Sequence, residues 1–214
     1  LVVPLCCPLR VVLQAVARWQ TLTELRLETC AGLTQQTLPA LWPICAQLST
    51  LSLWACDSHS EAFCATLRRC TRLVAVTLNL QAYTQALPGR PQGRVMIDPR
   101  EVLRSLASLG TLQSVGLYEV QDHGDDVGDH CDDRRQRSAL GSLLGRLANK
   151  LTILRLAECL PIREHDLGDL HDCPSLTCMD WGARTSYDSI SQFVRGSPNL
   201  RDLTLNDASF PIDR

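Results

Sequence analysis

The sequence predicts an α/β solenoid, a curved horseshoe of about seven repeats with parallel strands on its concave face and helices on its convex face. The phrase L-x-x-L-x-L occurs seven times in 214 residues, beginning at Leu22, Leu48, Leu73, Leu112, Leu151, Leu176 and Leu200. Each phrase holds three ladder positions; all 21 are apolar, and 17 are leucine. Between the phrases, apolar residues recur at helical spacing. Each repeat is therefore expected to supply one strand and one helix.

The strands are expected within the leucine phrases and the helices between them. The helical spacing covers Val11–Arg18, Leu38–Ala46, Glu61–Arg69, Pro99–Leu109, Ser138–Asn149, Asp166–Asp172 and Asp188–Arg195. The run Asp98-Pro99-Arg100-Glu101 is a helix start, with an acid at the N-cap, proline in the first turn and glutamate three residues after the cap. This divides the chain into a helical flank over 1–21, a repeat array over 22–206 and a tail over 207–214.

Two intervals between phrases are too long for a single repeat. The spacings are 26, 25, 39, 39, 25 and 24 residues, whereas leucine-rich repeats run to about 20–29 residues. The excess is placed in insertions over 81–97 and 121–137. Both follow a strand and precede a helix in consecutive repeats. We therefore expect them to emerge side by side from one rim of the horseshoe.

Cysteines recur in register with the leucines. The first slot, three residues after the last ladder leucine, holds Cys30, Cys56 and Cys159; the second, three residues before the next phrase, holds Cys45, Cys70 and Cys173. From Leu22 to Asn206 this pattern resembles the cysteine-containing leucine-rich repeat family. Because buried cysteine behaves as a small hydrophobe, the six are expected in the core. Cys178 lies within a strand on the concave side and is the thiol most expected to be exposed.

The residues between the ladder positions are expected to line the concave face, because side chains alternate along a strand. One row passes through Arg26, Arg155 and Asp180 and a second through Trp54, Asn79 and Tyr118, the latter three on adjacent strands. Tryptophan, tyrosine and arginine are the side chains that most often anchor protein interfaces. These six residues are the predicted partner-binding site. The alternative is that Trp54 folds against its own loop.

The second insertion is strongly acidic. It contains Asp122, Asp125, Asp126, Asp129, Asp132 and Asp133, followed by Arg134, Arg135 and Arg137. Its two histidines, one cysteine and carboxylates are metal donors, but their spacing matches neither an EF-hand nor a zinc site. The expectation is a solvated acidic loop or a docking element for a charged partner, without a metal.

Composition narrows the class of function. The net charge of −2 gives no overall attraction to nucleic acid or membrane, and no apolar stretch is long enough to span a bilayer. No serine or cysteine pairs with a histidine in a known catalytic motif, and no phosphate-binding glycine loop is present. Neither an enzyme nor a cofactor is expected. Eleven cysteines, an odd number, and the absence of a glycosylation sequon favour an intracellular protein, and Leu1–Leu9 is not expected to act as a signal.

The leading expectation is a non-enzymatic scaffold that binds protein through its concave face and the two-loop rim within a larger complex. The family that the repeats resemble includes substrate-recognition halves of F-box ubiquitin-ligase adaptors, and it is structurally related to ribonuclease-inhibitor-like proteins. Since Leu1–Gln20 is too short for an F-box, an adaptor role would require a longer parent chain. An architectural subunit fits equally well. The alternative is an RNA-contacting subunit that uses some of the twenty arginines; a metal- or thiol-dependent enzyme is the third class.

Overall fold

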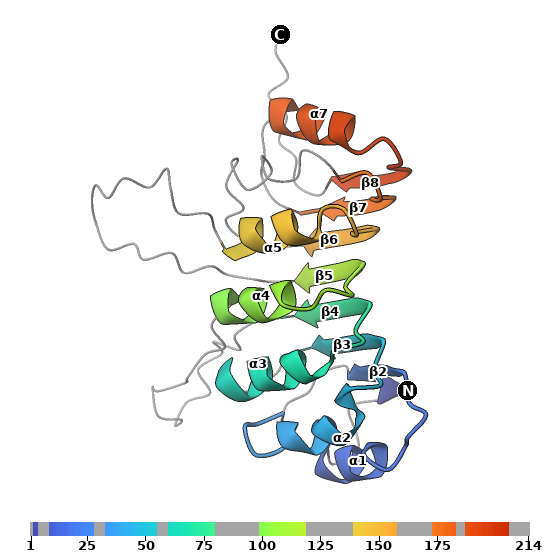
Figure 1. The fold of residues 1–214 in the computed structure, drawn as a ribbon, viewed down its shortest axis with the longest axis vertical. Coiled ribbons are helices and arrows are strands. Elements are labelled where there is room, and N and C mark those ends of the chain that lie inside the picture. The colour runs from blue at the N-terminus through green and yellow to red at the C-terminus, as the bar shows by residue number, and fades with distance from the viewer. Residues whose placement is uncertain are drawn as a thin grey trace, which may run out of the picture.

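Each leucine phrase contributes one strand to a single sheet. The computed structural model describes residues 2–3, 9–27, 33–54, 60–79, 99–118, 139–157, 173–182 and 187–205. Within them the sheet has eight parallel strands in chain order, and these stack along the long axis of the molecule (Figure 1). The strands are β1 Val2–Val3, β2 Glu24–Leu27, β3 Thr50–Trp54, β4 Ala75–Asn79, β5 Ser114–Tyr118, β6 Ile153–Ala157, β7 Cys178–Trp181 and β8 Asp202–Leu205.

The first strand is not foreseen by the leucine pattern. β1 pairs with β2, so that Val2 lies opposite Arg26 and Val3 opposite Leu27. The other seven strands, β2 to β8, each carry the second and third ladder residues of one phrase. The prediction of a parallel sheet built in chain order is confirmed for these seven.

Helices alternate with the strands, and Figure 1 shows them on one side of the sheet. They are α1 Leu9–Val16, the 3-10 helix η1 Leu38–Leu41, α2 Trp42–Cys45, α3 Ser60–Arg69, α4 Pro99–Ala107, α5 Ala139–Leu147 and α7 Tyr187–Gly196. The single helix predicted over 38–46 is instead divided into η1 and α2. Pro39 and Pro43 each lie in the first turn of their element, the place where a missing N–H costs least. The helix expected at Asp166–Asp172 and both insertions lie outside the described residues.

The ladder side chains form the core, together with the inner faces of the helices. Seventeen of the 21 ladder positions are buried, including Met179 and Trp181 in the sixth phrase. The four exceptions are Leu22, Leu200, Leu203 and Leu205, all in the first or last phrase. Leu203, on β8, is 39% exposed. Ladder side chains are thus buried throughout the phrases from Leu48 to Trp181. In the first phrase Leu25 and Leu27 are also buried, with β1 beside β2.

A repeated hydrogen-bond pattern holds the edge at which the strands begin. The carbonyl of the residue before a strand accepts the backbone N–H groups of two successive residues in the next repeat. Thr23 O, for example, accepts from Ser49 N at 2.8 Å and Thr50 N at 3.1 Å. The same pair of bonds recurs at the carbonyls of Ser49, Val74, Gln113, Thr152 and Thr177. Because no repeat is skipped, this pattern fixes the register from β2 to β8.

The second cysteine slot is buried wherever it is described. Cys45, Cys70 and Cys173 are all buried, as predicted, whereas Cys30, Cys56 and Cys159 of the first slot lie outside the described residues. The hydrogen bond with the Cys70 thiol, aided by Arg69, lowers the pKa of Cys45 against the opposing effect of burial. The same hydrogen bond and burial raise the pKa of Cys70. We read these thiols as core packing groups.

We expect Leu154→Asp to unfold the chain. Burial of Leu154 contributes about 1.5–3 kcal/mol, and an unpaired buried carboxylate costs more, so the loss approaches the total stability of a typical domain. The matched control is Leu203→Asp, the same ladder position in the exposed last repeat, which should cost about 1 kcal/mol or less. Thermal melts followed by circular dichroism measure both. A cooperative melt retained by Leu154→Asp would contradict the register described above.

Ser197 lies three residues before the last phrase, in the position that cysteine occupies in other repeats, and it allows a second test of the core packing. Its hydroxyl is buried and has no hydrogen-bond partner among the described residues, whereas the equally buried Ser105 donates to Glu101 O at 2.8 Å. Ser197→Cys should raise the free energy of unfolding by about 1 kcal/mol, because it removes an unsatisfied polar group. Ser105→Cys should lower it by a similar amount. Urea titration distinguishes the two, and equal effects would contradict this reading of the slot.

Candidate functional site

The sheet face opposite the helices carries three rows of side chains, and we call it the open face. It is the face toward which residues between the ladder positions point. The first row is Glu24, Thr50, Ala75, Ser114, Ile153, Cys178 and Asp202; the second is Arg26, Ser52, Thr77, Gly116, Arg155, Asp180 and Thr204; the third includes Trp54, Asn79, Tyr118 and Ala157. Members of a row are direct register partners on neighbouring strands. The second and third rows are those predicted from the sequence.

Trp54 and Tyr118 form a stacked pair on the open face. Their ring centroids lie 5.4 Å apart, with 28° between the ring planes. The residues sit on β3 and β5, about 9.5 Å apart at the usual strand spacing. Their side chains therefore lean toward each other across β4, where Asn79 is the register partner of both. The indole N–H of Trp54 donates to Ser52 Oγ at 3.1 Å, which fixes the tilt of the ring.

The pair is preformed and still accessible. Trp54 is 37% exposed, and Tyr118 is half-buried. The alternative in which Trp54 folds against its own loop concerns residues 55–59, which lie outside the described residues. The stacking partner that the structure describes comes from a strand two positions along the sheet. Two large rings are thus held against each other on the face of the sheet.

Gly116 provides the room for this arrangement. A Cβ atom at this position would lie 3.2 Å from Thr77 Oγ1 and 3.4 Å from Tyr118 Cε2. The absence of a side chain lets the phenol ring lie down over its own strand toward β4. Gly116 is consequently buried beneath its neighbours, although it lies on the open face.

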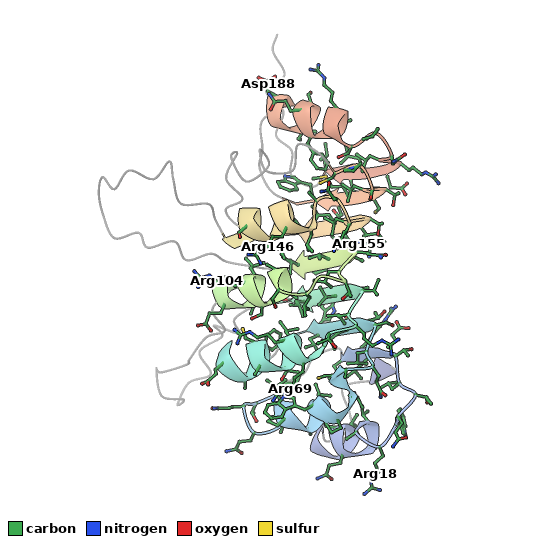
Figure 2. The ribbon with its side chains drawn as sticks, viewed as in Figure 1. Arg18, Arg69, Arg104, Arg146, Arg155 and Asp188 are labelled. Carbon is green, nitrogen blue, oxygen red and sulfur yellow. The ribbon has the colours of Figure 1, made fainter. Side chains whose placement is uncertain are left out.

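Charged side chains flank the pair on both sides. Arg26 and Glu24, two residues apart on β2, form an ion pair in which Nε and Nη2 both lie 2.7 Å from Oε1. Arg155 on β6 is exposed, and no side chain that the structure describes forms an ion pair with it. Asp180 on β7 is its register partner, and Asp202 on β8 is exposed. Figure 2 places Arg155 on the strand side of the molecule and Arg104 and Arg146 on the helix side.

All six predicted binding residues therefore lie on the open face, but the structure groups them unequally. Trp54 and Tyr118 are in contact; Arg26 is paired within its own strand; Arg155 and Asp180 lie side by side at the far end. The aspartates of the predicted acidic loop, from Asp122 to Asp133, lie outside the described residues. So do all five histidines.

The first row was only partly foreseen. Its expected member Cys178 is half-buried, whereas the four other described cysteines are buried. Glu24 and Asp202 were not predicted as site residues, although they stand two positions before residues of the second row. The period of two that placed Arg26 on this face also places Glu24 there.

A second aromatic contact lies on the helix side and was not predicted. The guanidinium carbon of Arg69 lies 3.8 Å from the centre of the Trp42 ring, and Trp42 Nε1 donates to Thr66 Oγ1 at 3.2 Å. Trp42 is 37% exposed, the same fraction as Trp54. It provides a matched control for experiments on the open face.

Other kinds of site receive no support from the described part of the chain. In the ranges that the structure describes, no group of three or more histidine, cysteine, aspartate or glutamate side chains could hold a metal ion. No helix there is long and apolar enough to cross a membrane. In comparison with known proteins, neither a family model nor a curated protein matches the chain.

Gly116→Val should break the aromatic pair while leaving the fold intact. The added side chain competes with the phenol ring for the space beside Thr77, but valine is well tolerated in a strand. We expect the near-ultraviolet circular dichroism bands of the coupled rings to weaken, with no change in the far-ultraviolet spectrum. Thr204→Val, in the same row on β8, should alter neither spectrum. An unchanged aromatic signal in Gly116→Val would contradict the described packing.

Proposed function

We propose that the chain is a leucine-rich repeat solenoid whose open face is the concave surface of a curved horseshoe. Support comes from the sequential parallel sheet, the helices on one side of it and the repeat lengths of 24–26 residues where no insertion intervenes. Such arrays bury a continuous core by stacking and leave an extended face available for binding.

We further propose that this face binds another protein and that the chain is not an enzyme. The observation that carries the proposal is the preformed, exposed Trp54–Tyr118 stack. Tryptophan and tyrosine dominate the binding energy of protein interfaces, and rings fixed before binding lose little entropy on complex formation. A substrate-recognition subunit and an architectural subunit of a larger intracellular assembly would both use such a surface.

The charges on the open face weigh against the RNA-contacting alternative. An RNA-binding face needs uncompensated basic side chains to neutralise phosphates. The described rows hold two arginines, Arg26 and Arg155, against three carboxylates, Glu24, Asp180 and Asp202. Arg26 is already paired with Glu24. A protein partner, whose own charges can be of either sign, is the better match.

Replacing Trp54 and Tyr118 together by alanine should weaken capture of the native partner by tenfold or more. Two lost anchors of about 1–2 kcal/mol each predict at least this factor. The melting temperature should fall by no more than about 5 °C, because the stack itself contributes only about 0.5–1.5 kcal/mol. Affinity purification from the native source, quantified by mass spectrometry, supplies the measurement.

Trp42→Ala is the control, since it removes an equally exposed tryptophan from the helix side. It should leave capture unchanged. If capture survives the double variant and is lost in Trp42→Ala, the binding surface is the helix side and the proposal is wrong. Ribonuclease treatment of the lysate should not reduce capture; a loss would favour the RNA-contacting alternative.

A further inference from the structure

We infer that the partner presents an extended segment laid across the strands, with a large apolar residue, then an acidic residue about three or four positions away, then a basic residue about two to four positions beyond. This inference rests on the proposed function, and it specifies the chemistry that the open face recognises. Three features carry it: the place of the aromatic pair, the unpaired charge on β6 and the acidic end of the sheet.

Distances across the face set the spacing of the segment. The Trp54–Tyr118 stack is centred over β4, Arg155 stands on β6, and Asp180 and Asp202 stand on β7 and β8. Neighbouring strands are about 4.8 Å apart, and Arg155 lies one row before the stack, an offset of about 6.6 Å along the strand, so the two are separated by about 12 Å. An extended chain advances about 3.3 Å per residue and covers that distance in about three to four residues. The acidic end begins one strand further and ends at β8.

The order of the charged side chains on the open face determines which charges the bound segment should carry. Arg155 is exposed and has no ion-pair partner among the described side chains, so a carboxylate beside it gains a partner without displacing one. Beyond Arg155 the face becomes acidic, with Asp180 and then the exposed Asp202. A basic side chain there meets the exposed carboxylate of Asp202. Arg26, at the opposite end, is neutralised by Glu24 and does not compete for the acidic residue.

The apolar residue belongs at the aromatic pair. The two rings lie beside three small residues, Ser52, Thr77 and Gly116, and the indole of Trp54 is exposed. A phenylalanine, leucine or tryptophan placed there buries apolar area on both sides of the contact. Among segments that carry such an apolar residue, those with the complementary charge order should bind best. An acidic residue at the wrong position would lie beside Asp180 or Asp202 and be repelled.

The test is a selection from a random library of displayed peptides of about twelve residues, long enough to span β3 to β8. The wild-type chain should enrich a large apolar residue followed, in either chain direction, by an acid at about three or four positions and a base about two to four further on. The variant Arg155→Glu/Asp180→Arg/Asp202→Arg should enrich the same apolar residue with the charges exchanged. Its substitutions are at partly or fully exposed positions, so its melting temperature should match the wild type.

Binding affinities then make the result quantitative. The selected wild-type peptide should lose about tenfold or more in affinity when its acid and base are exchanged, and the charge-reversed variant should recover that loss. Enrichment without this charge order, or equal affinity for both peptides, would overturn the inference. A single-stranded oligonucleotide that competes with the peptide more strongly at low salt would also overturn it.

Alkylation of Cys178 locates the bound peptide independently. Its partly exposed thiol lies between Ile153 and Asp202 in the first row, along the path from Arg155 to the acidic end. Bound peptide should slow its reaction with iodoacetamide several-fold, read by mass spectrometry at that cysteine alone. Saturating peptide that leaves the rate unchanged would show that the segment lies elsewhere. If no peptide is enriched while native capture still depends on Trp54 and Tyr118, the inference fails and the proposed function stands.

Discussion

Each strand of the sheet buries its ladder side chains against the strands and helices on either side of it. Seventeen ladder positions are buried, including Leu25 and Leu27 beside β1, and the other four lie in the first or last phrase. The carbonyl before each strand reinforces the stacking by accepting two N–H groups from the next repeat. A slip of one residue would turn leucines onto the open face and polar residues into the core. The core therefore dictates which residues are displayed on the other face.

The candidate site results from this fixed placement of side chains on the open face. Because register partners are held one strand spacing apart, Trp54 and Tyr118 can meet only by leaning over β4, and they do so where Gly116 leaves space. Because the strands lie in the sheet in chain order, the order of side chains along the chain is also their order across the open face. Aromatic rings, a positive charge and a negative end follow one another from β3 to β8. If the open face binds a partner, the order of these groups as well as the buried area determines which partner fits.

The sequence predicts the backbone and the rows well, and the contacts between side chains poorly. The period of two in the leucine phrases places Trp54, Asn79 and Tyr118 in one row, and the cysteine register predicts the burial of Cys45, Cys70 and Cys173. The stacking across Asn79 was not predictable, because it depends on ring orientations set by Gly116 and Ser52. The Arg69–Trp42 contact joins two different helices, α3 and α2, whose relative placement no local pattern encodes. β1 escaped prediction because two valines have no periodicity.

If the partner binds the open face, a crosslinker placed at a defined position on that face should capture it. A photoreactive amino acid at Ser114, in the first row on β5, lies on the same strand as Tyr118. One at Arg104, exposed on α4, points from the helix side. On irradiation in the native cell, we expect a crosslinked partner from position 114 and none from position 104. A partner crosslinked from position 104 alone would contradict it.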